Sequence, residues 1–148
     1  IFPPHHAINV WPDQNYAYIP GVNYGIKNCG KTPAIITQQY VDIVILEALP
    51  ANPPYAPPII YGDGIVAAGD EMGPSFIPVG DGNTVTTITT EDWKAFAEQK
   101  KFFLFFGYVK YESIFGKKHE TRFGYRFQIE NAYSTFNEVG GDAYNKRT

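Results

Sequence analysis

The sequence predicts an all-β protein, an immunoglobulin-like β-sandwich of about seven or eight strands with one short helix over residues 91–101. The main observation is an alternation of side chains from His119 to Ile129, in which one face is largely apolar and the other is polar. The 11 Phe, 11 Tyr and 2 Trp of the chain support the same fold class, because aromatic residues favour strands. Closure of the strands into a barrel is the alternative architecture.

A long β-hairpin over residues 102–129 is expected at the centre of the fold. Its first run, residues 102–111, is rich in aromatic residues and almost uninterrupted, which is typical of a central strand that is covered on both faces. Its second run is the alternating segment. Gly116 lies in the connection, where it supplies the positive φ that a short hairpin loop needs.

Three further strands are predicted within the first 49 residues. A short edge strand is expected at residues 7–11, because four prolines surround it. A strand over residues 23–28 ends in a loop that contains Gly and Pro. The apolar run of residues 34–49 predicts a long strand with a bulge at Gln38-Gln39.

The connecting segments follow from their proline, glycine and acidic residues. Residues 50–58 contain five prolines and predict a stiff connector that crosses an end of the sandwich. A polyproline ligand is the alternative, with Tyr55 as a candidate anchor for a partner. Residues 59–83 are interpreted as turns, because their acidic residues lack the spacing of a calcium loop. Short strands are predicted at residues 84–88 and 133–136.

The predicted helix has a recognisable start. Thr89 and Asp92 have the spacing of a capping box, in which each side chain bonds the backbone of the other residue. Acidic residues follow in the first turn, where they favour a helix N-terminus. The apolar face of the helix is expected to carry Trp93, Phe96 and Ala97.

The length of 148 residues predicts a single domain, residues 1–148, with an irregular N-terminal segment (1–20) and a loosely held tail (142–148). No apolar run approaches the roughly 18 residues of a membrane span, and no signal-peptide pattern is present. Because the chain starts with Ile1 rather than Met, a trimmed or processed product with an upstream targeting segment is expected.

Charge and cysteine content limit the possible partners and cofactors. The net charge is −3 and no basic cluster is longer than Lys117-Lys118, so a nucleic-acid partner is not expected. Cys29 is the single cysteine, which excludes an internal disulfide and a zinc site made of thiolates. No cofactor is predicted.

No catalytic, cofactor-binding or metal-ligating residue is predicted. His5 and His6 are interpreted as solvated loop residues, because adjacent side chains on an extended segment point to opposite faces. His119 is expected to bond a backbone carbonyl or Tyr111 at the end of the hairpin rather than to act as a catalytic base. A carboxylate pair for glycoside hydrolysis and an exposed aromatic surface for sugar stacking are both left open.

Two segments resemble a known family. Residues 28–34 read N-x-G-x-T-P-A, and residues 107–123 read G-x-x-x-Y-x-x-x-F-G-x-x-H-x-T-x-F. Together they are similar to the soluble C-terminal domain of uncharacterised bacterial membrane-anchored proteins, although Glu112 and Ser113 stand where the family often has Asp. The resemblance covers most of the chain from about Asn23 onward. It implies a β-sandwich and a membrane tether outside this chain. It carries over no catalytic residue, because the family has no assigned activity.

The expected function is that of a non-catalytic accessory or interaction module, presented next to a membrane as part of a larger assembly and bound to a protein partner. A rigid aromatic scaffold with Pro- and Gly-rich connections favours contact over turnover. The resemblance implies membrane association, with the extracytoplasmic side favoured. A domain that binds a small ligand or carbohydrate is the alternative, and a hydrolase that uses carboxylates alone is a third hypothesis.

Overall fold

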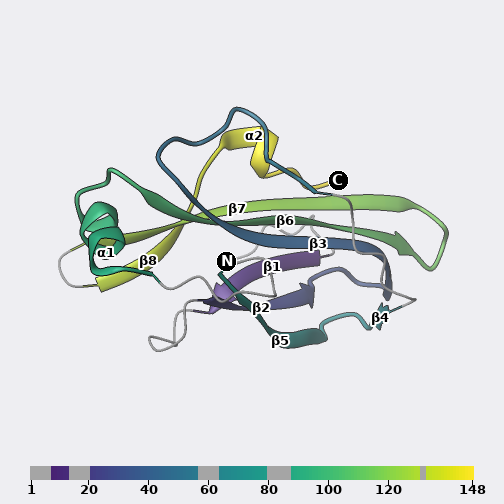
Figure 1. The fold of residues 1–148 in the computed structure, drawn as a ribbon. Helices are drawn as coiled ribbons and strands as arrows, with labels where there is room; N and C mark the ends of the chain where they lie inside the picture. Colours follow the sequence, from purple (N-terminus) through teal and green to yellow (C-terminus); the bar gives the residue numbers. More distant parts are fainter. Residues whose placement is uncertain (1–7, 14–20, 57–63, 80–87, 131–132) are drawn as a thin grey trace.

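The computed structural model describes residues 8–13, 21–56, 64–79, 88–130 and 133–148. These residues form mainly strands, with two short helices (Figure 1). The strands are β1 (Ile8–Asp13), β2 (Gly21–Asn28), β3 (Ala34–Leu46), β4 (Gly64–Val66), β5 (Glu71–Pro78), β6 (Phe102–Ser113), β7 (Lys118–Glu130) and β8 (Tyr133–Glu138); the helices are α1 (Thr90–Ala97) and α2 (Gly141–Tyr144). The prediction of an all-β protein is confirmed.

The strands form two antiparallel sheets. The smaller sheet has the order β1-β2-β5, and the larger sheet has the order β4-β3-β6-β7-β8. Figure 1 shows the smaller sheet beneath the larger one, in which the long strands β3, β6 and β7 lie side by side. The strand predicted at residues 7–11 is β1, and its place at an edge is confirmed.

The β6–β7 hairpin lies at the centre of the larger sheet, as predicted. Its two strands are paired without a break along ten residue pairs. The Ser113 N–H donates a hydrogen bond to the Lys117 carbonyl at 2.9 Å, and the Gly116 N–H donates one to the Ser113 carbonyl at 2.8 Å. Gly116 has a φ of 76°, which confirms the positive φ predicted for it. Residues 102–109 are all buried, as expected of a strand that is covered on both faces.

The long strand predicted from residue 34 is β3, and it contains the predicted bulge. Its pairing with β6 shifts at Thr37, directly before the predicted position at Gln38-Gln39. The Thr37 Oγ1 donates a hydrogen bond to the Lys110 carbonyl at 3.1 Å, which holds the bulge against β6. β3 ends three residues earlier than predicted.

Two clusters of buried side chains stabilise the fold. The first lies between the two sheets, and its buried members are Val22, Ile26, Ala34, Ile36, Ile43, Val66, Val79, Phe96, Phe103, Phe105, Val109, Tyr111 and Phe123. The second lies on the other face of the larger sheet, and its buried members are Tyr40, Phe102, Leu104, Phe106, Tyr108 and Tyr144. Successive residues of β6 point alternately into the two clusters, which explains why this strand is apolar without alternation.

The described part of the proline-rich segment covers this second cluster, so the prediction that it crosses an end of the sandwich is wrong. The Tyr55 ring packs against the rings of Tyr40, Phe106 and Tyr108, at centroid distances of 5.5, 5.8 and 5.1 Å. Its hydroxyl donates a hydrogen bond to the Gly107 carbonyl at 3.5 Å. Tyr55 therefore anchors the segment to its own sheet and does not serve as an exposed anchor for a partner.

The prediction of turns over residues 59–83 is wrong in part, because β4 and β5 lie there. β5 is an edge strand, and six of its eight residues are exposed. Such a strand has no buried face to create an alternating pattern, and its Gly73 and Pro74 are unfavourable in strands. Except for its last residue, the strand predicted at residues 84–88 lies outside the described residues.

The C-terminal segment is firmly held, so the prediction of a loose tail at residues 142–148 is wrong. Tyr144 of α2 is fully buried. Its ring lies against Gly124 and Gly140, and its hydroxyl donates a hydrogen bond to the Pro50 carbonyl at 2.9 Å. The Tyr144 side chain thus joins α2 to the larger sheet and to the proline-rich segment.

Beyond α2 the chain continues along β7. The Arg122 N–H donates a hydrogen bond to the Lys146 carbonyl at 2.7 Å, and the Thr148 N–H donates one to the Glu120 carbonyl at 3.1 Å. The C-terminal segment thus pairs with the first part of one edge of β7, and β8 pairs with the last part of the same edge.

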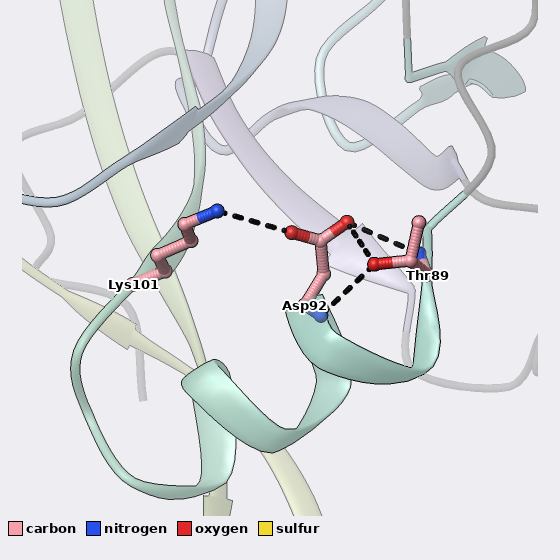
Figure 2. A network of polar contacts seen from close by, with 3 residues as sticks. All are labelled: Thr89, Asp92 and Lys101. Carbon is pink, nitrogen blue, oxygen red and sulfur yellow. Dashed lines mark hydrogen bonds and ion pairs between the residues drawn. The ribbon is translucent and has the colours of Figure 1, made fainter.

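α1 begins as predicted and ends early. The Asp92 N–H donates to the Thr89 hydroxyl, and the Thr89 N–H donates to the Asp92 carboxylate, both at 3.1 Å (Figure 2). Figure 2 also shows Lys101, whose Nζ lies 3.3 Å from the other carboxylate oxygen. The helix ends at Ala97 rather than at residue 101, and the left-handed φ of 59° at Gln99 ends the helical course.

Replacement of Thr89 by Ala should lower the free energy of unfolding by about 1 kcal/mol, because the hydroxyl that accepts the Asp92 N–H is lost. Hydrogen bonds from the Thr89 N–H and hydroxyl hold the pKa of Asp92 below its usual value, so the substitution should also raise that pKa. Urea unfolding and an NMR titration of Asp92 measure both effects. The control is Thr90→Ala, inside the helix; an equal loss in the two variants would contradict the role of the cap.

Candidate functional site

An open groove of about 560 Å³ lies at the end of the larger sheet where the β6–β7 hairpin turns, and we call it the hairpin groove. β3, β6, β7 and the C-terminal segment contribute to it. It is lined by Thr37, Gln38, Lys110, Tyr111, Glu112, Lys118, His119, Glu120 and Thr148. Strand register assembles these residues, since Gln38 is paired with Lys110 and Lys110 with Glu120.

His119 makes the backbone contact that is one of its two predicted alternatives, and it stacks on Tyr111 rather than bonding to it. Its ring stacks on the Tyr111 ring, with a centroid distance of 5.1 Å and an interplanar angle of 15°. Its Nδ1 lies 2.8 Å from the Thr148 carbonyl oxygen. Because a backbone oxygen can only accept hydrogen bonds, Nδ1 is the donor in this contact.

Two carboxylates line the hairpin groove, and each has a cationic partner. Glu120 forms an ion pair with the Arg122 guanidinium. A Glu112 carboxylate oxygen lies 3.9 Å from Lys118 Nζ, in a pair whose lysine side chain is 84% exposed. The groove therefore presents charges of both signs.

The threonine hydroxyls of the groove are bonded to the backbone. Thr37 Oγ1 donates to the Lys110 carbonyl at 3.1 Å, and Thr148 Oγ1 accepts from the Glu120 N–H at 2.8 Å. A hydroxyl nucleophile needs a base within hydrogen-bonding reach. Neither of these two described hydroxyls is hydrogen-bonded to His119.

An exposed apolar turn adjoins the groove. Ile114 and Phe115 connect β6 to β7, and they are 53% and 81% exposed. Lys117 and Lys118 follow them and are also exposed. In Figure 1 this turn forms the right-hand end of the larger sheet, beyond its other strands. We call residues 114–118 the hairpin tip.

Trp93 lies on α1, at the opposite end of the larger sheet from the hairpin tip (Figure 1). It is 42% exposed, and its ring packs edge-on against the rings of Phe96 and Phe127. The predicted apolar face of the helix is confirmed at Phe96, which is buried, and is wrong at Ala97, which is exposed. Among the described Trp and Tyr side chains Trp93 alone is exposed, so these residues offer no coplanar pair for sugar stacking.

The corner between β2 and β3 carries the first of the two family-like motifs. Asn28 is fully buried there, and its Nδ2 donates hydrogen bonds to the Thr32 and Val66 carbonyls at 2.8 and 2.9 Å. Its Oδ1 accepts one from the Gly30 N–H at 2.9 Å. The motif is therefore a structural corner in which the Asn28 side chain replaces missing backbone partners.

Two partly buried tyrosines should make the protein sensitive to alkali. Burial raises the pKa of Tyr55 to about 12 and that of Tyr125 to about 12, from an ordinary value of 10.0. The unfolded chain releases these protons at lower pH, so the stability they contribute is complete below about pH 10 and is lost as the pH rises through about 12. The denaturant midpoint should fall between about pH 8 and about pH 11, and less so in Tyr55→Phe. If the denaturant midpoint of Tyr55→Phe falls by the same amount as that of the wild type, Tyr55 does not contribute to the pH dependence.

The described residues contain neither a metal-binding cluster nor a membrane-spanning helix. No three His, Cys, Asp or Glu side chains in that part of the chain lie close enough together to hold a metal ion. His5 and His6 lie outside it. No helix in the described ranges is both long and apolar enough to cross a membrane. The candidate site is the hairpin groove with the adjoining hairpin tip, where polar lining residues and exposed apolar side chains lie together.

The protein is therefore all-β, with two antiparallel sheets and an open polar groove at one end of the larger sheet. A comparison of the chain with models of protein families, with curated proteins and with solved structures finds no match. The resemblance to bacterial membrane-anchored proteins stays a prediction that depends on the two motifs.

Proposed function

We propose that this protein is a non-catalytic accessory or interaction module that binds a protein partner through the hairpin groove. The observation that carries the proposal is that the carboxylates and the histidine of the groove already have partners within the protein. Both carboxylates pair with cations, and the proton on His119 Nδ1 is directed at a carbonyl. Such a lining suits recognition by complementary charges, which fixes the register of a bound chain.

The setting of this module is part of the proposal. The resemblance of residues 28–34 and 107–123 supports a larger assembly beside a membrane, on the extracytoplasmic side, with the tether outside this chain. Two sheets that share one core support an immunoglobulin-like sandwich as the finer description of the fold. In such sandwiches the loops at the ends carry recognition, and the hairpin groove lies at one end.

Affinity capture from the membrane fraction of the source organism, with mass spectrometry, tests the proposal. Lys118→Glu reverses a charge of the groove. Lys94→Glu on α1 is the matched control, because each lysine is highly exposed and lies 3.9 Å from a glutamate. We expect a stoichiometric partner that the wild type and Lys94→Glu retain and Lys118→Glu loses. Equal recovery with both variants, or no enriched protein, would overturn the proposal.

A domain that binds a small ligand or carbohydrate is the second candidate, because about 560 Å³ lies in the usual range of ligand sites. A glycan array and thermal-shift screening with wild type and Lys118→Glu test it. A third candidate is a hydrolase that uses Glu112 and Glu120, since both line the groove with His119. Turnover of a glycoside that is abolished by Glu112→Gln would replace the proposal of a non-catalytic module.

A further inference from the structure

The hairpin tip contains apolar side chains that the turn itself does not require. A three-residue hairpin loop closed by a positive-φ residue needs glycine at Gly116 and accepts polar residues at the two positions before it. Ile114 and Phe115 occupy these positions and remain largely in contact with water, which is unfavourable for apolar surface. Their identity therefore points to a contact outside the chain.

The shape of the tip favours a lipid bilayer over a protein surface as its binding partner. Two side chains on a convex turn present much less than the roughly 800 Å² that each partner buries in a stable protein interface. A lipid interface needs no preformed pocket, because aromatic and aliphatic side chains enter the boundary between headgroups and acyl chains.

The charges around the tip favour anionic lipids. Lys117 and Lys118 are exposed directly behind the apolar pair. Among the described residues, the ion pair of Lys118 is a long, exposed contact with Glu112, and such a pair leaves the lysine charge accessible. The other nearby carboxylate, that of Glu120, is paired with Arg122. Lysine side chains at headgroup depth behind inserted apolar residues are typical of interfacial anchors.

We propose that the hairpin tip inserts Ile114 and Phe115 into the interface of a membrane that contains anionic lipids, with Lys117 and Lys118 among the headgroups. This inference rests on the proposed function, since it places the hairpin groove and its partner at the membrane surface. The protein would then have two contacts with its surroundings, one with lipid and one with protein.

Vesicle flotation tests the inference with the chain as it exists. Phosphatidylcholine vesicles with phosphatidylserine should bind the wild type, and phosphatidylcholine vesicles alone should bind it much less. Ile114→Ser with Phe115→Ser should weaken partitioning about tenfold or more. Lys117→Gln with Lys118→Gln should weaken it by roughly fivefold per lysine and reduce its salt dependence. Phe76→Ser is the control, because Phe76 is 46% exposed on β5 of the other sheet.

Fluorescence separates insertion from adsorption. Phe115→Trp should show a blue shift with phosphatidylserine vesicles and quenching by brominated lipid chains, whereas Phe76→Trp should show neither. An unshifted spectrum of Phe115→Trp would overturn insertion.

The outcomes also separate this inference from the proposed function. Lipid binding that depends on the tip supports the inference. It does so even if Lys118→Glu captures the same proteins as wild type, because that result contradicts only the proposed protein partner. No binding of the wild type to phosphatidylserine vesicles, or equal binding by the Ile114→Ser and Phe115→Ser variant, overturns it. If the Ile114→Ser and Phe115→Ser variant instead loses a protein that the wild type captures, the tip is a contact with a protein. The proposed function as an interaction module is then retained, and the lipid inference is overturned.

Discussion

Replacement of Tyr144 by Ala should lower the free energy of unfolding by about 3–5 kcal/mol. The ring is fully buried against Gly124 and Gly140, and neither glycine has a side chain that can move into the space left behind. The bond to the Pro50 carbonyl is lost as well. Urea unfolding followed by circular dichroism measures the loss. Hydrogen exchange should increase first at residues 141–148, because this side chain fixes their segment.

Tyr144→Phe is the matched control for this prediction. It keeps the ring and removes only the hydroxyl, so it should cost about 1 kcal/mol. If Tyr144→Ala costs no more than Tyr144→Phe, the ring does not hold the C-terminal segment and the buried contact is unimportant for stability.

Replacement of Gly107 by Ala should cost about 3 kcal/mol, because the added Cβ would enter occupied space in the middle of the larger sheet. It would overlap the Tyr40 carbonyl oxygen and lie 2.7 Å from the Phe123 ring. The carbonyl belongs to β3, so it can yield only if β3 moves away from β6. Thermal and urea unfolding measure the loss.

Gly64→Ala provides the comparison within a strand of the same sheet. The nearest atom to a Cβ at this position is 4.0 Å away, on Ile36. The substitution should therefore change the stability by less than about 1 kcal/mol in either direction. Similar losses in the two variants would show that steric contact at Gly107 is not the cause.

The parts of the fold that the sequence predicts best are those with a local pattern. The alternation in residues 119–129 and the apolar run in residues 102–111 predict β6 and β7, because each strand shows its burial in its own residues. β5 lacks such a pattern, since most of its side chains are exposed at an edge. The docked tail was missed for another reason: Tyr144 looks like any tail residue until the fold provides Gly124 and Gly140 to receive it.

The candidate site was predicted only in its parts. The contacts of His119 with a carbonyl and with Tyr111 follow from its place at the end of the hairpin. The groove combines Gln38, Lys110 and Thr148, which are far apart in sequence and meet through strand register. The signal that could have found it is the presence of polar residues at neighbouring ends of three predicted strands.

β6 pairs with a neighbour in sequence on one side and with a distant strand on the other. Its pairing with β7 closes a short turn, whereas its pairing with β3 must first bring Leu46 to Phe102. Closing a longer loop costs more entropy, and pairing between distant strands slows folding. We therefore expect β6, β7 and β8 to assemble first, while β3 docks later. Until β3 docks, the backbone groups at that edge of β6 are unpaired, and self-association during refolding should be greatest in that interval.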